Sequence, residues 1–246
     1  MALISKRQKN RRYLLYSSLL LSPITYYYLS PYLIIMAASE GIVNGSFIVF
    51  SLMFLSSLVF GRVFCGWLCP AGGLQRCCMR INNKQFTVGK RNWIKYIVWI
   101  PWVSLVIYIL VYAGEIRSIN PFYQTYHGIS VQDPGSLILF ILIFGAIGLI
   151  SIFSGRRGFC HYLCWMAPFM IIGRRIRNIG KWFSLRLLAD KSKCIDCMSC
   201  TENCTMSLDV NKMVKKGNME NTECILCGTC IDVCPTDVIS FSYSSG

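Results

Sequence analysis

Histidine and acidic residues are scarce in this chain. Its 246 residues include only two histidines, His127 and His161, and 11 Asp and Glu stand against 25 Lys and Arg, for a formal net charge of +14. A haem held between two histidines needs both rings on one iron, whereas these two lie beyond opposite ends of a long apolar stretch, residues 135–154. The sequence is therefore not that of a b-type cytochrome.

Charged residues are also missing from the interiors of four apolar stretches. These stretches cover residues 13–36, 41–60, 93–113 and 135–154. Only Lys95 falls inside one, near its start, and Pro23, Pro31 and Pro101 are tolerated because neighbouring membrane helices satisfy the freed backbone groups. Twenty helical residues at about 1.5 Å each cover the roughly 30 Å hydrocarbon core of a bilayer. Residues 1–190 are therefore predicted to form a membrane α-helical domain with four transmembrane helices in the lipid bilayer.

The positive charge alternates between the segments that connect these stretches. Basic residues cluster before the first stretch, between the second and third, and after the fourth, whereas Glu40, Glu115, Arg117 and Asp133 are the only charges in the other two connections. The positive-inside rule then places both termini in the cytoplasm of a multi-pass plasma-membrane protein. Topology, and not nucleic-acid binding, accounts for the basic charge. The first stretch is too long for a signal peptide and no A-x-A site follows it, so it is expected to be retained.

The last quarter of the chain repeats the cysteine run C-x2-C-x2-C-x3-C, and Pro235 follows the second copy. In this spacing three thiolates bind one 4Fe–4S cluster and the fourth binds the other cluster. The first cluster is assigned Cys194, Cys197, Cys200 and Cys234. The second cluster is assigned Cys224, Cys227, Cys230 and Cys204. Zinc and disulfides are the alternatives. Zinc sites use C-x2-C pairs and not a run of four cysteines, and disulfide bonds would not require the same run twice. Residues 191–246 are thus predicted to form an α+β two-cluster ferredoxin module, which handles electrons.

Two further cysteine pairs follow the second and fourth apolar stretches. They are Cys65 and Cys69 in GRVFCGWLCPAGG, and Cys160 and Cys164 in GRRGFCHYLCWMAP. The pairs form an internal repeat on the cytoplasmic side, and if each segment is helical, its two sulfurs share one face. The four thiols are candidates for an additional metal, cluster or thiol–disulfide site, with Arg62 and Arg157 offsetting negative charge. The alternative is that they only pack. The adjacent Cys77 and Cys78 are compatible with simple packing and with a supporting role at this site.

The two histidines differ in setting. His127 lies in NPFYQTYHGISVQDPG, the connection expected on the outer side, beside Tyr123 and Tyr126. A histidine there is a candidate quinol proton acceptor because its ordinary pKa is near neutrality. An interfacial loop with belt aromatics is the alternative. His161, within the second cysteine pair, is expected at the surface.

The order of GRVFCGWLCP, the NPF…H loop, GRRGFC-x3-C and the tandem ferredoxin run resembles the NapH/NosR/CcoG-type membrane polyferredoxins of prokaryotic plasma membranes, and most of all the NapH-type quinol dehydrogenase membrane subunit. The resemblance covers nearly the whole chain. It implies four transmembrane helices, cytoplasmic 4Fe–4S clusters, and electron exchange between the quinone pool and a redox partner protein. His127 falls where the NapH-type loop has its histidine. The chain departs from the family where Trp165 follows Cys164 and Thr205 follows Cys204, positions at which the family has proline.

The sequence predicts an iron–sulfur protein that passes single electrons between a membrane donor, a quinol, and a redox partner protein. An alternative is a copper reductase or maturation factor in which Cys65, Cys69, Cys160 and Cys164 bind the ion, because soft thiolates suit Cu(I). A third possibility is a membrane anchor whose clusters only support the assembly of a larger complex.

Overall fold

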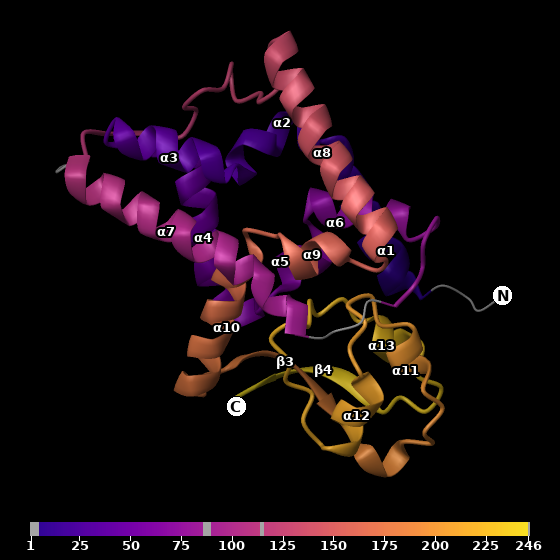
Figure 1. Ribbon diagram of the computed structural model, residues 1–246. Coiled ribbons are helices and arrows are strands. Elements are labelled where there is room, and N and C mark those ends of the chain that lie inside the picture. The colour runs from indigo at the N-terminus through magenta and orange to yellow at the C-terminus, as the bar shows by residue number, and fades with distance from the viewer. Residues whose placement is uncertain (1–4, 86–89, 114–115, 246) are drawn as a thin grey trace.

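The computed structural model describes residues 5–85, 90–113 and 116–245, and Glu115 of the expected outer connection lies outside these ranges. Figure 1 shows long helices above a small yellow and orange module that contains the C-terminus. Two short helices, each containing the first cysteine of a CxxxC pair, lie between the two parts. One continuous apolar core joins them, because Cys65 and Met170 of the helical part and Ile225 and Leu226 of the module belong to the same buried cluster.

The first apolar stretch does not form one helix. It is divided into α1 (Lys6–Leu20), α2 (Ser22–Thr25), the 3₁₀ helix η1 (Tyr26–Leu29) and α3 (Pro31–Ser39). Pro23 and Pro31 each occupy the first turn of a new helix, where the missing proline N–H costs nothing. Proline therefore starts helices here, whereas the sequence interpretation expected a tolerated kink in a continuous span.

Three further helices form from the other apolar stretches. They are α4 (Gly45–Phe60), α7 (Ile94–Ala113), which follows the 3₁₀ helix η2 (Lys90–Trp93), and α8 (Pro134–Ser154). Among the described residues, only α7 and α8 are both long and apolar enough to cross a membrane, and just 11% and 17% of their apolar windows are buried. The prediction of four transmembrane helices is thus not confirmed.

The starts of α4 and α8 are fixed by side-chain caps. The Asn44 side chain accepts a hydrogen bond from the Phe47 N–H, and Asp133 accepts from the N–H groups of Gly135 and Ser136. Such caps satisfy N–H groups that have no partner within the helix. Just before α4, β1 (Ile42–Asn44) pairs in parallel with β2 (Ser118–Asn120). Residues 42–44, which the sequence analysis placed at the start of the second apolar stretch, therefore form a strand that pairs with the connection after the third stretch.

The internal repeat is visible in the order of the helices. The first copy contains α4, α5 (Val63–Trp67) and α6 (Pro70–Cys78), and the second contains α8, α9 (Gly158–Tyr162) and α10 (Ala167–Gly180). The copies exchange partners, because α10 packs on α4 and α6 packs on α8. At the first of these contacts a Cβ atom on Gly173 would collide with the Ser57 hydroxyl. Close packing of α10 on α4 therefore requires glycine at this position.

The C-terminal module contains the antiparallel strands β3 (Ser184–Ala189) and β4 (Ile239–Ser244), with Leu187 opposite Phe241. Between them lie η3 (Lys191–Lys193), α11 (Ser199–Glu202), α12 (Val210–Lys215) and α13 (Thr229–Asp232). The sheet of the module therefore begins at Ser184, ahead of the boundary at residue 191 that the first cysteine run suggested.

Candidate metal centres

The eight ferredoxin-type cysteines line two separate cavities in the C-terminal module. One cavity is lined by Cys204, Cys224, Cys227 and Cys230. The other is lined by Cys194, Cys197, Cys200 and Cys234. Each cavity therefore combines three cysteines of one run with the last cysteine of the other run. This grouping is the one that crossed ligation requires, and the ligand assignment itself stays a prediction.

Each cavity is lined by four cysteines and by apolar side chains, a lining that fits a 4Fe–4S cluster. Among the residues that the structure describes, no group of three or more His, Cys, Asp or Glu side chains is arranged to hold one metal ion. In a 4Fe–4S cluster each thiolate binds a different iron, so its ligands surround a cage and do not converge on a point. The walls of the two cavities are apolar, with Leu187 and Ile225 in one and Val214 and Ile239 in the other.

Hydrogen bonds and a nearby cation act on Cys227. The hydroxyl oxygens of Thr205 and Thr229 each lie 3.4 Å from its Sγ. Burial opposes ionisation of this thiol, but Arg11 and the two hydroxyls more than offset burial, so the pKa of Cys227 lies below its ordinary value. Burial raises the pKa of Cys204 in the same cavity to about 12. The site thus favours a thiolate at Cys227, the form that binds iron.

The four CxxxC cysteines are buried together between the helices and the module. Cys65 lies in α5 and Cys160 in α9, and all four have exposed fractions of only 3 to 4%. Burial, together with the neighbouring thiols of Cys65 and Cys160, raises the pKa of Cys69 to about 12. All four cysteines belong to the same buried cluster, and the thiols of the two repeats are close enough to raise one another's pKa. We call Cys65, Cys69, Cys160 and Cys164 the four-thiol group.

Each CxxxC segment breaks between its cysteines and does not continue as one helix. The Cys69 N–H donates to the Phe64 carbonyl at 3.0 Å, and the Cys164 N–H donates to the Phe159 carbonyl at 3.1 Å. These matching bonds span five residues and end α5 and α9 before the second cysteine. The sequence analysis placed the two sulfurs of each pair on one face if the segment was helical, and here the helix ends before the second cysteine. The same turn occurs in both repeats and places the second cysteine of each pair just beyond the end of the helix.

Two fully buried arginines flank the four-thiol group. The side chains of Arg62 and Arg157 have exposed fractions of 0% and 1%. Arg157 Nη1 donates to the Cys65 carbonyl at 2.9 Å, and Gln75 Nε2 donates to Cys160 Sγ at 3.1 Å. The Nε and Nη2 atoms of both arginines have no hydrogen-bond partner among the described residues. Buried unpaired donors are costly, so this surrounding fits an anionic group bound to thiolates.

The first CxxxC segment touches the module directly. A Cβ atom on Gly66 would collide with the Ile225 carbonyl, which lies between Cys224 and Cys227. Trp67 Nε1 donates to the Leu226 carbonyl at 3.1 Å, and Arg11 Nε donates to the Gly66 carbonyl at 3.0 Å. The four-thiol group and one ferredoxin-type cavity are therefore held together by backbone contact.

Two glutamates of the module bind buried cations of the helical part. Glu223 accepts from Arg62 Nη1 at 2.8 Å and from Lys95 Nζ at 2.5 Å, while Glu220 accepts from Arg174 Nε at 2.5 Å. Burial opposes ionisation of Glu223, but its two cations more than offset burial and hold its pKa at about 2. The sequence analysis did not find these pairs, because the partners are far apart in the chain.

The two histidines and the adjacent cysteines Cys77 and Cys78 do not belong to the four-thiol group. His161 is buried, and burial lowers its pKa to about 4, so the expectation of a surface residue was wrong. His127 is exposed, with its ring against Tyr126 at a centroid distance of 4.4 Å. Cys78 packs with its Sγ 3.8 Å from the Gly148 carbonyl, and Cys77 is exposed.

An apolar cavity of about 610 Å³ reaches the second CxxxC segment. Its lining includes Tyr26, Tyr32, Gln124 and Ile143, and also Trp165, the residue after Cys164. Trp165 Nε1 donates to the Leu29 carbonyl at 3.1 Å, which fixes the indole in the wall. A mainly apolar cavity of this size with a few polar groups is typical of sites for small molecules. His127 does not line it.

Comparison with known proteins agrees with these sites. A family model described as "4Fe-4S binding domain" matches residues 45–93 and 136–183, one match for each repeat. A model described as "4Fe-4S dicluster domain" matches residues 193–239. No solved structure matches the chain.

Curated relatives match about three quarters of the chain. An uncharacterized protein of Methanocaldococcus jannaschii is 28% identical over 76% of this chain and 75% of its own length. Protein NirI of Paracoccus denitrificans is 30% identical over 75% of this chain but only 26% of its own length. Ferredoxin-type protein NapH of Haemophilus influenzae is 27% identical over 74% of this chain and 62% of its own length.

The cysteine-lined cavities, the two family models and these relatives define a polyferredoxin, an electron-transfer protein with several iron–sulfur sites. Within that class, the chain belongs to the NapH/NosR-type polyferredoxins. The relatives named NirI and NosR extend well beyond the part that this chain matches.

Cluster content is the first test of the ferredoxin-type sites. Anaerobically prepared protein is expected to contain at least about eight iron and eight sulfide per chain, since each 4Fe–4S cluster has four of each. Cys194→Ser and Cys224→Ser are each expected to weaken the EPR signal of one cluster first. The matched control is Cys77→Ser, an exposed cysteine outside both cavities. Iron near zero with stoichiometric zinc would contradict the assignment.

Proposed function

We propose that the protein is a multi-pass membrane protein that passes single electrons from a quinol, through the four-thiol group, to the two ferredoxin-type sites and on to a soluble redox partner. One observation carries the proposal: the buried four-thiol group lies between the long helices and the module, in a segment that packs directly on the wall of one cysteine-lined cavity. The link between the four-thiol group and the module is the packing of Gly66 on the backbone between Cys224 and Cys227.

The apolar cavity beside Trp165 supports a quinol as the donor. It is bounded by η1, α3 and α8 and ends at the residue that follows Cys164. The ring and tail of a quinol need apolar walls. The few polar groups of the cavity, such as Gln124 and the Tyr26 hydroxyl, would orient the quinol head group. His127 keeps its role as candidate proton acceptor only if its exposed loop moves towards this cavity.

The residues around the four-thiol group are suited to hold a cluster there. Iron–sulfur clusters supply one-electron chemistry, and the protein sets ligation, burial and hydrogen bonding. Four thiolates with bridging sulfides carry net negative charge, which Arg62 and Arg157 offset at close range. Gln75 adds a hydrogen bond to Cys160 Sγ. Hydrogen bonds to cluster sulfurs and positive charge both favour reduction.

Copper handling is the second candidate function. One observation favours it, because Met170 Sδ lies 3.8 Å from Cys65 Sγ and a thioether beside thiolates suits Cu(I). The two buried guanidiniums next to the same thiols disfavour a bare cation. We therefore place copper second, with the redox role first.

A quinol reduction assay separates the two functions. Purified protein in lipid nanodiscs is expected to show reduced-cluster EPR signals after addition of a quinol analogue, and no signal with the matching quinone. Leu139→Trp, which fills the cavity beside Trp165, should abolish the signal while dithionite still reduces the clusters. Tyr112→Trp, on an exposed face of α7, is the control. Stoichiometric copper in the four-thiol group without quinol-dependent signals would favour the alternative.

Membrane topology gives a further expected result. A reporter fused to the C-terminus is expected to report the cytoplasm, and one inserted beside Gly128 the outer side, because basic residues follow α4 and α8 while few charges lie between α7 and α8. Paired alkaline phosphatase and green fluorescent protein fusions at both positions provide the measurement. A C-terminus on the outer side would contradict the proposed arrangement.

A further inference from the structure

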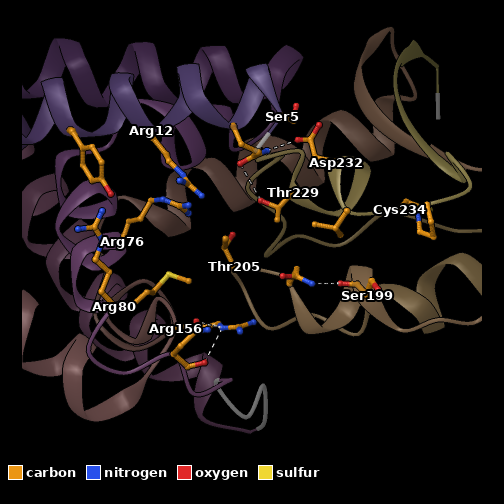
Figure 2. Close-up of a pocket in the computed structure, with 17 residues that line it drawn as sticks. Ser5, Arg12, Arg76, Arg80, Arg156, Ser199, Thr205, Thr229, Asp232 and Cys234 are labelled. Atoms are coloured by element: carbon orange, nitrogen blue, oxygen red, sulfur yellow. Dashed lines mark hydrogen bonds between the residues drawn. The ribbon is translucent and has the colours of Figure 1, made fainter. Parts of the chain in front are cut away.

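A large basic cavity lies between the helical part and the C-terminal module. Its volume is about 690 Å³, and its walls come from α1 and α6 on one side and from α11 and α13 on the other. Figure 2 shows Arg12, Arg76 and Arg80 on the helical side, facing Thr205, Thr229 and Cys234 across the cavity. It shares Thr205 and Thr229 with one cysteine-lined cavity and Cys234 with the other, and it is separate from the apolar cavity beside Trp165.

The charge of this cavity is not balanced by the protein. Arg12, Arg76, Arg80 and Arg156 line it, whereas Asp232 is the only acidic residue in its lining. Both carboxylate oxygens of Asp232 are already engaged, one by Arg7 Nη2 at 2.9 Å and the other by Gln8 Nε2 at 2.6 Å. No ion pair joins the four arginines to any carboxylate within the described residues.

The arginines repel one another. Arg12 Nε is buried and has no hydrogen-bond partner in the part of the chain that the structure describes. Burial and then the charge of Arg12 lower the pKa of Arg76. Only Arg156 has extensive contacts, since it donates to the Asn83 carbonyl at 3.1 Å and to the Asn83 side chain at 2.8 Å. Like charges held this close together are destabilising unless an anion joins them.

The size and donor chemistry of the cavity indicate the class of ligand. About 690 Å³ lies within the range of small-molecule sites. Planar guanidinium groups bind phosphate oxygens through paired hydrogen bonds. We propose that this cavity binds a phosphate-bearing anion, supplied either by the head group of an anionic phospholipid or by a soluble diphosphate.

The position of the cavity gives such a ligand an effect on the clusters. Thr205 and Thr229 line the cavity, and their hydroxyls also contact Cys227 Sγ. Cys234 of the other ferredoxin-type site lies in the same wall. Because an anion beside a cluster disfavours its reduction, bound phosphate is expected to lower the midpoint potential of the clusters.

The test measures binding first and potential second. Cluster-loaded full-length protein in phosphatidylcholine nanodiscs is titrated with pyrophosphate by isothermal calorimetry. In a second arm, native mass spectrometry counts the phosphatidylglycerol retained by protein from mixed nanodiscs. Binding in the first arm indicates a soluble source, and retention in the second indicates a lipid. An EPR redox titration with and without the bound anion measures the shift in potential.

The test variant is Arg12→Gln/Arg76→Gln, and the control is Arg175→Gln/Lys216→Gln, which removes the same charge from exposed positions outside the cavity. The test variant loses two charge-assisted contacts, so it is expected to bind at least about tenfold more weakly, which corresponds to about 1.4 kcal/mol. The control should bind within about twofold of wild type. Arg80→Gln, at an exposed side chain, should give a partial loss and guards against misfolding of the double variant. Equal binding by test and control variants, or no binding in either arm, would overturn the proposal.

Discussion

Replacing Cys65 and Cys160 with alanine is expected to abolish quinol-dependent reduction of the ferredoxin-type clusters. The variant removes one thiol from each repeat, and the two thiols belong to a single buried group between the apolar cavity and the module. Without that group, electrons from the cavity have no bound centre before Cys227. The two EPR signals of the module should persist when dithionite is the reductant.

Stability is expected to change little in this variant. Cysteine and alanine differ by one buried sulfur atom, so each substitution should cost about 1 kcal/mol through packing alone. The matched control is Cys78→Ala, since Cys78 is buried and packs against α8 but lies outside the four-thiol group. It should keep wild-type electron flow. Wild-type quinol-dependent reduction in the Cys65→Ala/Cys160→Ala protein would show that the four thiols only pack.

Replacing Glu223 with glutamine is expected to cause the largest loss of stability. Glu223 is the carboxylate partner of both Arg62 and Lys95, whose side chains have exposed fractions of 0%. Glutamine has the same shape but leaves two buried positive charges without a counter-charge. Loss of one partner of a buried ion pair costs about 3 to 5 kcal/mol, which corresponds to a fall of roughly 10 °C in Tm for a chain of this size.

Thermal unfolding of cluster-loaded protein, followed by tryptophan fluorescence, provides the measurement. Glu202→Gln is the control, because Glu202 is an exposed carboxylate of the same module. A Tm in Glu223→Gln equal to that of the control would show that the buried cations do not need this carboxylate.

Acid should weaken the same contact in the wild-type protein. Burial alone would raise the pKa of Glu223, but Arg62 and Lys95 hold it at about 2, below its ordinary value of 4.5. The unfolded chain therefore binds the proton first, so the stabilisation is complete above pH 4.5 and is lost as the pH falls towards 2. Urea unfolding at stepwise lower pH should show this loss in wild type and a flatter profile in Glu223→Gln.

The cysteine groups could be predicted from the sequence because ligand spacing is a local property. A turn of two or three residues between cysteines sets which thiols face one cavity, and the crossed position of Cys204 and Cys234 follows from the repeated run. A local property, the position of two prolines, also explains why residues 13–36 do not form the single helix that was predicted. Hydropathy recorded an apolar stretch there, but Pro23 and Pro31 begin new helices, and the stretch is divided between them.

The electrostatic contacts could not be predicted, because their partners are far apart in the chain. Glu223 lies 161 residues from Arg62, and no sequence pattern connects them. The sequence analysis attributed Arg12 and Arg76 to membrane topology, which explains their sign but not their place in a cavity. Only the packing of α1 and α6 against the module brings these charges together.

The exchange of helices between the two repeats has a consequence for the order of assembly. Because α10 of the second repeat packs on α4 of the first, and α6 of the first packs on α8 of the second, neither half completes its own hydrophobic contacts. The four-thiol group forms only after the second half has been synthesised and has docked. Any cofactor held there must therefore be inserted after the second half has docked on the first.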